Sequence, residues 1–149
     1  MEELILKNSG KTVKIKTASF QNAIKLKKEA FKCLGRTNSL EKIKDLQNVD
    51  LKTLISEIAN LLVEADTSDG FNRALMECLG VCICDGSHAI TEQYFNDCPE
   101  LWEDYYEIVS KCVEVNLRPF FKSLASELKT RFSNLEELQA LKSQPKKKS

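Results

Sequence analysis

Residues 99–116, PELWEDYYEIVSKCVEVN, have the periodicity of a helix whose apolar side chains cover a wide arc. The apolar positions are Leu101, Trp102, Tyr105, Ile108, Val109, Cys112 and Val113. A surface helix keeps its apolar residues on one stripe, so the wider arc predicts contacts on more than one side. Pro99 suits the first helical position, where its missing N–H costs nothing. Pro119 predicts a kink or a fresh start after Asn116.

Helical periodicity continues on both sides of this segment. Phe20, Ile24, Lys27, Phe31 and Leu34 recur at helical spacing before Gly35, a suitable helix end. Further apolar stripes run through residues 51–65, 71–82, 119–128 and 135–141, and a short helix is expected from 91. The expected N-caps are Ser19, Ser39, Asp50, Ser68, Thr91 and Ser133. Together these patterns predict about six helices.

The β pattern lies at the N-terminus, in residues 2–17. Leu4 and Leu6 alternate with polar residues before an Asn-Ser-Gly turn, and Val13 and Ile15 alternate after it. A lone two-stranded hairpin is marginally stable in water, so its apolar face must lie on helices or pair with another chain. The predicted fold is therefore mainly α: a single helical domain over 1–142 with an N-terminal hairpin, followed by a disordered basic tail at 143–149.

The composition is that of an ordinary soluble protein. The 149 residues are 42% hydrophobic and 30% charged, and no apolar run reaches the roughly 18 residues of a membrane helix. The N-terminus lacks the apolar region of a signal peptide, so we expect a cytoplasmic protein without membrane contact. Six cysteines in that compartment are expected to be reduced thiols.

Residues 77–88, ECLGVCICDGSH, bring Cys78, Cys82 and Cys84 close in sequence to the chain's single histidine, His88. Structural zinc sites usually contain C-x2-C pairs, whereas the spacing here is C-x3-C-x-C-x3-H. Cys78 and Cys82 extend the stripe that begins at Phe71, and free cysteine is among the most often buried residues. If the helix persists, Cys84 points about 200° away from Cys82. We therefore favour core packing and expect no metal or cofactor; a zinc module is the alternative.

The sequence contains no recognisable catalytic motif. A phosphate-binding glycine loop, G-x-S-x-G and H-E-x-x-H are all missing. His88 lies in an acidic turn that we expect to be exposed, and acidic surroundings raise rather than lower the pKa of a nearby thiol such as Cys84. Glu100, Glu103, Asp104 and Glu107 could be imagined as paired catalytic carboxylates, but their spacing is that of a solvated helix face. We predict that the protein is not an enzyme.

Charge is unevenly distributed although the formal net charge is zero. Residues 1–44 have eleven Lys or Arg against four Asp or Glu, whereas residues 85–107 have seven acids and no Lys or Arg. The asymmetry favours self-association or an ionic partner surface; oppositely charged solvated faces that offset one another are the simpler explanation. A small nucleic-acid-binding regulator is the alternative function. We expect no specific nucleic-acid recognition, because aromatic residues are not interleaved with the lysines.

Aromatic residues are concentrated around the acidic helix and Pro119. They are Trp102, Tyr105, Tyr106, Phe120 and Phe121. Some of these rings are expected to fill the core, while others form an exposed patch of the kind that binds other proteins. We predict that the partner-binding residues are among these five.

The order of these segments resembles a known family. The hairpin EELILKNSGKTVKIKTASF, the helix entry DTSDGFNRALMECL, the segment DGSHAITEQYFND and the helix ELWEDYYEIVSKCVEVNLRPFFKSL are together similar to tail assembly chaperones of long-tailed bacteriophages. The resemblance covers residues 2–128, and DYYEIVSKCVEVNLRPFFKSL is its most specific part.

The resemblance implies a small helical protein that binds the tape measure protein, keeps it soluble and recruits the major tail (tube) protein. It implies action in the cytoplasm of the bacterial host and absence from the mature virion. A second, longer product made by ribosomal frameshifting is common in such proteins. Tape measure proteins are long and helical, so an apolar groove for a client helix and several chaperone copies per client are expected.

Overall fold

The computed structural model describes residues 1–36, 51–64 and 69–120, together with 122, 123, 126 and 130. It divides into two compact units, Met1–Pro119 and Phe120–Ser149, and the fold described below is that of the first. The predicted helices near 39–49 and 133–141, the predicted domain end at 142 and the basic tail lie outside the described residues.

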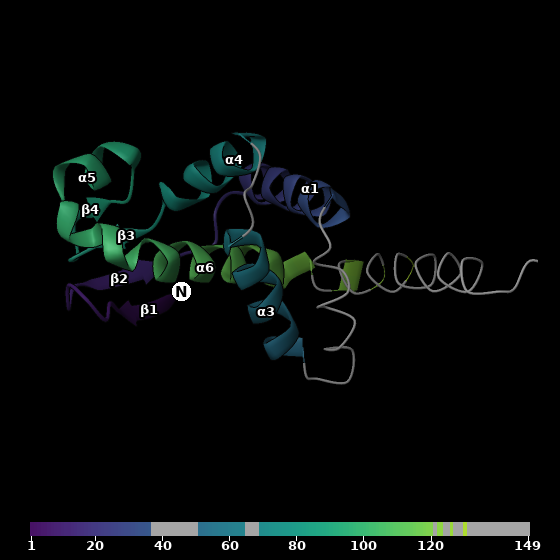
Figure 1. Ribbon diagram of the computed structural model, residues 1–149, viewed down its shortest axis with the longest axis horizontal. Helices are drawn as coiled ribbons and strands as arrows, with labels where there is room; N and C mark the ends of the chain where they lie inside the picture. The colour runs from purple at the N-terminus through teal and green to yellow at the C-terminus, as the bar shows by residue number, and fades with distance from the viewer. Residues whose placement is uncertain (37–50, 65–68, 121, 124–125, 127–129, 131–149) are drawn as a thin grey trace, which may run out of the picture. The chain divides into compact units, whose positions relative to one another are not determined.

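The described residues form five α-helices and a four-stranded sheet (Figure 1). The helices are α1 (Phe20–Arg36), α3 (Leu51–Glu64), α4 (Asp69–Leu79), α5 (Glu92–Asp97) and α6 (Tyr105–Leu117). The strands are β1 (Glu2–Ile5), β2 (Thr12–Ile15), β3 (Ile83–Cys84) and β4 (His88–Ala89). Two 3₁₀ helices, η1 (Pro99–Asp104) and η2 (Arg118–Phe120), flank α6. The mainly α class is confirmed; the prediction of about six helices was too high for these residues.

The predicted hairpin belongs to a larger sheet. All neighbouring strands are antiparallel in the order β1-β2-β3-β4, with Glu2 opposite Ile15 and Val13 opposite Cys84. The β3–β4 turn has positive φ at Asp85 (50°) and Gly86 (82°), which agrees with the turn predicted there. The hairpin is thus stabilised by strand pairing within the chain and by contact between β2 and α6.

Helix α6 is the centre of this unit, as its wide apolar arc predicts. It contacts α1, α3, α4, β2 and η1. Ile108, Val109, Cys112 and Val113 are completely buried. The segment before it was wrongly predicted as α-helix: Pro99–Asp104 is 3₁₀, and α6 begins at Tyr105.

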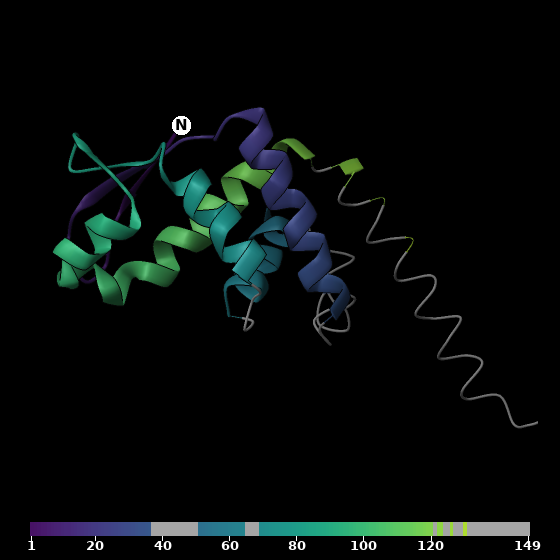
Figure 2. The same ribbon diagram turned by 90° about the horizontal axis from the view of Figure 1, so that it is seen from above.

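Helices α1 and α4 pack side by side over α6 in both views (Figures 1 and 2). Ser19 and Thr91 accept N-capping hydrogen bonds from the amides of Asn22 and Tyr94, as predicted. Helix α1 was predicted wrongly only in part: Phe20 is 67% exposed, whereas Phe31, on the same predicted stripe, is buried. Its buried face contains smaller residues as well as Leu26 and Phe31: Ala23, Ala30 and Cys33. The small side chains on this face allow a short distance between the axes of α1 and its neighbours.

Candidate protein-binding surface

Trp102 presents an aromatic ring to solvent from η1. Its side chain is 58% exposed, while its indole N–H donates a 2.7 Å hydrogen bond to the carbonyl oxygen of Phe95. The bond satisfies the one polar group of the indole and fixes the ring against α5. A rigid ring with its polar atom already paired loses little conformational entropy and needs no further polar partner on binding.

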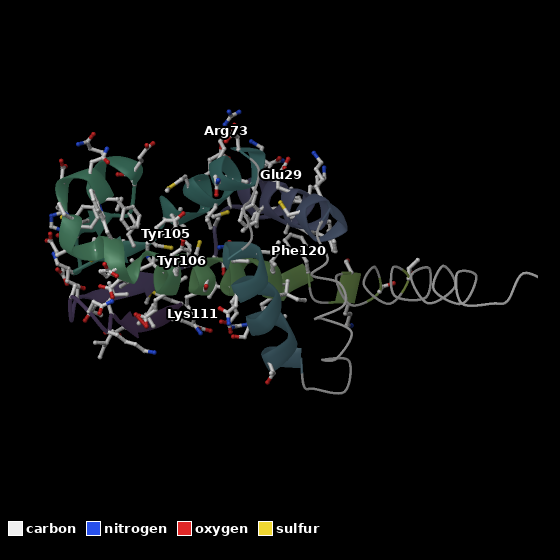
Figure 3. The ribbon with its side chains drawn as sticks, viewed as in Figure 1. Glu29, Arg73, Tyr105, Tyr106, Lys111 and Phe120 are labelled. Atoms are coloured by element: carbon white, nitrogen blue, oxygen red, sulfur yellow. The ribbon has the colours of Figure 1, made fainter. Side chains whose placement is uncertain are left out.

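Two tyrosines at the start of α6 extend this aromatic surface (Figure 3). Tyr105 packs edge-to-face against Phe95, with 5.6 Å between ring centroids, and against Tyr106, with 5.5 Å. Tyr105 is half-buried and burial raises the pKa of its hydroxyl, whereas Tyr106 is 61% exposed. Tyr105 therefore connects the buried ring of Phe95 to the exposed ring of Tyr106.

Tyr106 separates two hollows of the surface. The smaller, about 330 Å³, is the aromatic hollow, lined by Met76, Glu92, Phe95, Asn96, Trp102, Tyr105 and Tyr106. The larger, about 680 Å³, is the polar hollow, and its wall includes Leu4, Glu103, Glu107 and Lys111. A methionine beside aromatic rings gives an adaptable apolar lining of the kind used to bind varied side chains.

The tip of the β1–β2 hairpin holds this region in place. The buried carboxylate of Asp104 accepts hydrogen bonds from the backbone amides of Asn8 (2.9 Å) and Ser9 (3.0 Å). The Asn8 side chain donates to the carbonyl oxygen of Glu103, and the Lys7 amide donates to Glu107. Burial alone would raise the pKa of Asp104, but the hydrogen bonds from Asn8 and Ser9 to its carboxylate outweigh this effect and lower the pKa.

The family model described as phage tail assembly chaperone protein, TAC, matches residues 9–129. The chain belongs to the phage tail assembly chaperone family. No curated protein and no solved structure matches it significantly. The family resemblance expected from the sequence is thereby confirmed, and the family is one of assembly proteins with protein partners in tail formation.

The structure brings together three of the five aromatic residues predicted to bind partners of this chaperone. Trp102, Tyr105 and Tyr106 line the aromatic hollow. Phe120 is half-buried and belongs to the second compact unit, and Phe121 lies outside the described residues. Whether the three bind a partner remains a prediction.

Sequence reasoning missed two apolar members of the aromatic hollow, Met76 and Phe95. Met76 falls off the buried stripe of α4, which consists of Phe71, Ala74, Leu75, Cys78 and Leu79. The sequence did offer a signal for Met76, because a large apolar residue that lies off the core-facing stripe of a helix indicates a second contact surface. Phe95 gave no comparable signal, because its contact with Tyr105 depends on how α5 folds back onto α6.

Five of the chaperone's six cysteines are buried. Cys78, Cys82, Cys84 and Cys112 are completely buried, which confirms the packing prediction for the first two. Cys84 does not point away, as a continued helix would require: α4 ends at Leu79 and Cys84 lies in β3. Burial raises the pKa of Cys78 to about 12. Within the described ranges, no group of three or more His, Cys, Asp or Glu side chains is arranged so that it could hold a metal ion.

His88 is exposed, as predicted, and its ring stacks on Tyr94 with 5.3 Å between centroids. Its Nδ1 lies 3.3 Å from the hydroxyl of Ser87. Cys84, opposite it in the β3–β4 ladder, is buried, and burial raises the pKa of that thiol. The histidine therefore contributes to packing on the turn and has no activated thiol beside it.

An ion-pair group joins β1 to the end of α6. Glu2 contacts Lys111 (2.7 Å) and Arg118 (2.6 Å), and both cations also contact Glu114 (3.4 and 3.0 Å). Hydrogen bonds from Lys111 and Arg118 lower the pKa of Glu2 to about 2. A second group of ion pairs compensates part of the charge asymmetry seen in the sequence: Lys11, from the basic N-terminal part, contacts Asp85 and Glu100 of the acidic segment.

None of the described helices is long and apolar enough to cross a bilayer.

Proposed function

We propose that this tail assembly chaperone binds the tape measure protein, keeps it soluble and recruits the major tail (tube) protein. The observation that supports the proposal is the pair of exposed rings, Trp102 and Tyr106, on the walls of the aromatic hollow. A long helical client has apolar stripes that remain uncovered until tube subunits surround it. An aromatic hollow suits such a stripe through the helix-in-groove mode of recognition.

The chaperone acts in several copies on each client. A moderate affinity at each site permits release when tube subunits arrive, while many sites along one client keep it covered. Self-association between neighbouring copies adds to this coverage. The protein acts in the host cytoplasm and leaves before the virion matures.

Co-expression with the phage's tape measure protein tests the central step. The expected result is a soluble complex that elutes as one species, with a mass by light scattering that corresponds to several chaperones per client. The tape measure protein expressed alone provides the control. An insoluble client in the presence of folded chaperone, with no complex eluting, would overturn the proposal.

Recruitment is tested separately, by adding purified major tail protein to the preformed complex. Capture of the major tail protein by the complex, and not by tape measure protein or chaperone alone, is the expected result. Mass spectrometry of purified virions tests whether the chaperone is absent from the finished particle.

A further inference from the structure

Acidic residues outnumber basic ones in the linings of the two hollows around Tyr106: Glu92 lines the aromatic hollow, and Glu103, Asp104, Glu107 and Glu114 line the polar hollow together with Lys7 and Lys111. Residues 85–107 contain seven carboxylates and no Lys or Arg. One ammonium group, that of Lys11, contacts two of them, Asp85 and Glu100. Asp104 is occupied by the amides of the hairpin tip. The two linings thus contain five carboxylates and two ammonium groups, and Lys111 is itself paired with Glu2 and Glu114, so the region keeps a net negative charge.

Two of these carboxylates lie where a bound partner would meet them. Glu92 lines the aromatic hollow and Glu103 lines the polar hollow on the other side of Tyr106. Both are exposed, and no Lys or Arg in the described part of the chain forms an ion pair with either. Glu103 contacts the hairpin through its backbone carbonyl, so its carboxylate stays available.

We infer that this surface binds an amphipathic helix whose apolar stripe is bordered by Lys or Arg. The stripe enters the aromatic hollow against Trp102 and Tyr106, and the basic borders meet Glu92 and Glu103. Charge complementarity selects the partner: a helix with acidic borders would place like charges together, which costs binding free energy and slows association. The inference rests on the proposed function, in which the helix belongs to the tape measure protein.

Trp102 is the chain's single tryptophan, so its fluorescence reports on this surface directly. The probes are two tryptophan-free peptides of about 18 residues, roughly five helical turns, with the same leucine stripe and either lysine or glutamate borders. The full-length chaperone is titrated with each peptide at low salt. The lysine peptide is expected to shift the Trp102 emission to the blue and to bind about tenfold or more tightly than the glutamate peptide. The difference is expected to shrink at about 0.5 M salt.

The double variant E92K/E103K tests the role of the two carboxylates. It is expected to lose the preference for the lysine peptide, whereas E3K, which reverses an exposed charge on β1, is expected to keep it. Circular dichroism checks that both variants retain the fold. Equal binding of the two peptides, or an unchanged preference in E92K/E103K, would overturn the inference.

Other occupants of the surface give different results. Dimers that dissociate in E92K/E103K would place a second copy of the chain there, and a change in Trp102 emission on removing residues 143–149 would place the chain's own basic end there; either would overturn the inference. If the tape measure protein co-purifies while neither peptide affects Trp102, the proposed function stands and this surface is not its basis. If the tape measure protein does not co-purify, the proposed function fails, and the peptide titrations still decide the chemistry of the surface.

Discussion

The side chain of Asn116 binds the backbone of Ala18 in the interior of the protein. Its oxygen accepts a 2.8 Å hydrogen bond from the Ala18 amide, and its nitrogen donates a 2.8 Å bond to the carbonyl oxygen of Cys112. Asn116 is completely buried. The two residues are ninety-eight positions apart in the sequence, so this hydrogen bond joins the segment just before α1 to the end of α6.

We predict that Asn116→Ala lowers the free energy of unfolding by about 1–3 kcal/mol, because it leaves the buried Ala18 amide without an acceptor. Urea unfolding followed by circular dichroism measures the change. Asn96→Ala is the matched control, since Asn96 is exposed on α5, and its stability is expected to stay within about 0.5 kcal/mol of wild type. Equal stability of the two variants would contradict this account of the Asn116 hydrogen bonds.

Asp104→Ala is expected to release the hairpin tip from η1. The amides of Asn8 and Ser9 lose their acceptor, so their hydrogen exchange becomes faster, and stability falls by about 1–3 kcal/mol. Exchange measured by NMR on the folded protein separates this local effect from global unfolding. Glu100→Ala, also in η1 but exposed, serves as control, and the exchange of Asn8 and Ser9 is expected to remain slow in it.

Acid is expected to destabilise the protein partly through Glu2. Its pKa is lowered from 4.5 to about 2 in the folded chain, so the contribution of its ion pairs is complete above pH 4.5 and is lost as the pH falls toward 2. Unfolding free energies measured from about pH 6 to pH 3 are expected to fall less steeply in Glu2→Gln than in wild type. Identical slopes would show that Glu2 is not held by Lys111 and Arg118 in solution.

The six thiols are expected to differ in their reactivity. Cys98 is half-buried, whereas Cys33, Cys78, Cys82, Cys84 and Cys112 are buried. With a thiol reagent near pH 8, we expect one fast-reacting group in the folded protein and all six after unfolding, because the reagent cannot reach the five buried thiols until the chain unfolds. Cys98→Ser is expected to remove the fast phase. Stoichiometric zinc in the purified protein would contradict the packing account of the cysteines.

Binding of the tape measure protein is expected to depend on the two exposed rings. Trp102→Ala and Tyr106→Ala each are expected to weaken the complex by about 2 kcal/mol, roughly thirtyfold, with helicity unchanged. Ile5→Ala provides a control of similar exposure, at 70% against 61% for Tyr106, on β1. Loss of helicity in Trp102→Ala would instead assign the indole to the core, and unchanged affinity in both variants would remove the aromatic hollow from the binding site.

The sequence predicted the elements that are defined by long periodic patterns. The arc of α6 and the stripe of α4 each repeat several times, and the sheet alternation of Leu6, Val13 and Ile15 appears on both sides of a glycine turn. The family resemblance rested on the order of these same segments. Burial then follows from periodicity, because a repeated apolar face has to be covered.

The remaining features depend on contacts between distant segments. Strands β3 and β4 have two residues each, too few for alternation, and exist because β3 pairs with β2. The stripe through Cys82 was extended past Gly80, although α4 ends at Leu79. In the candidate site, Trp102 belonged to the apolar arc in the sequence, and only the fold of α5 against η1 shows that its ring faces solvent.

The position of α6 has a consequence for how the protein melts and how it can be shortened. The sheet and three of the helices all contact this one helix, which is completed only at Leu117, near the end of the first unit. Because the sheet and these helices are packed on the same helix, we expect them to unfold together when α6 is incomplete. Calorimetry of residues 1–119 should accordingly give a single cooperative transition, and nascent chains that stop short of Leu117 should be substrates for host proteases.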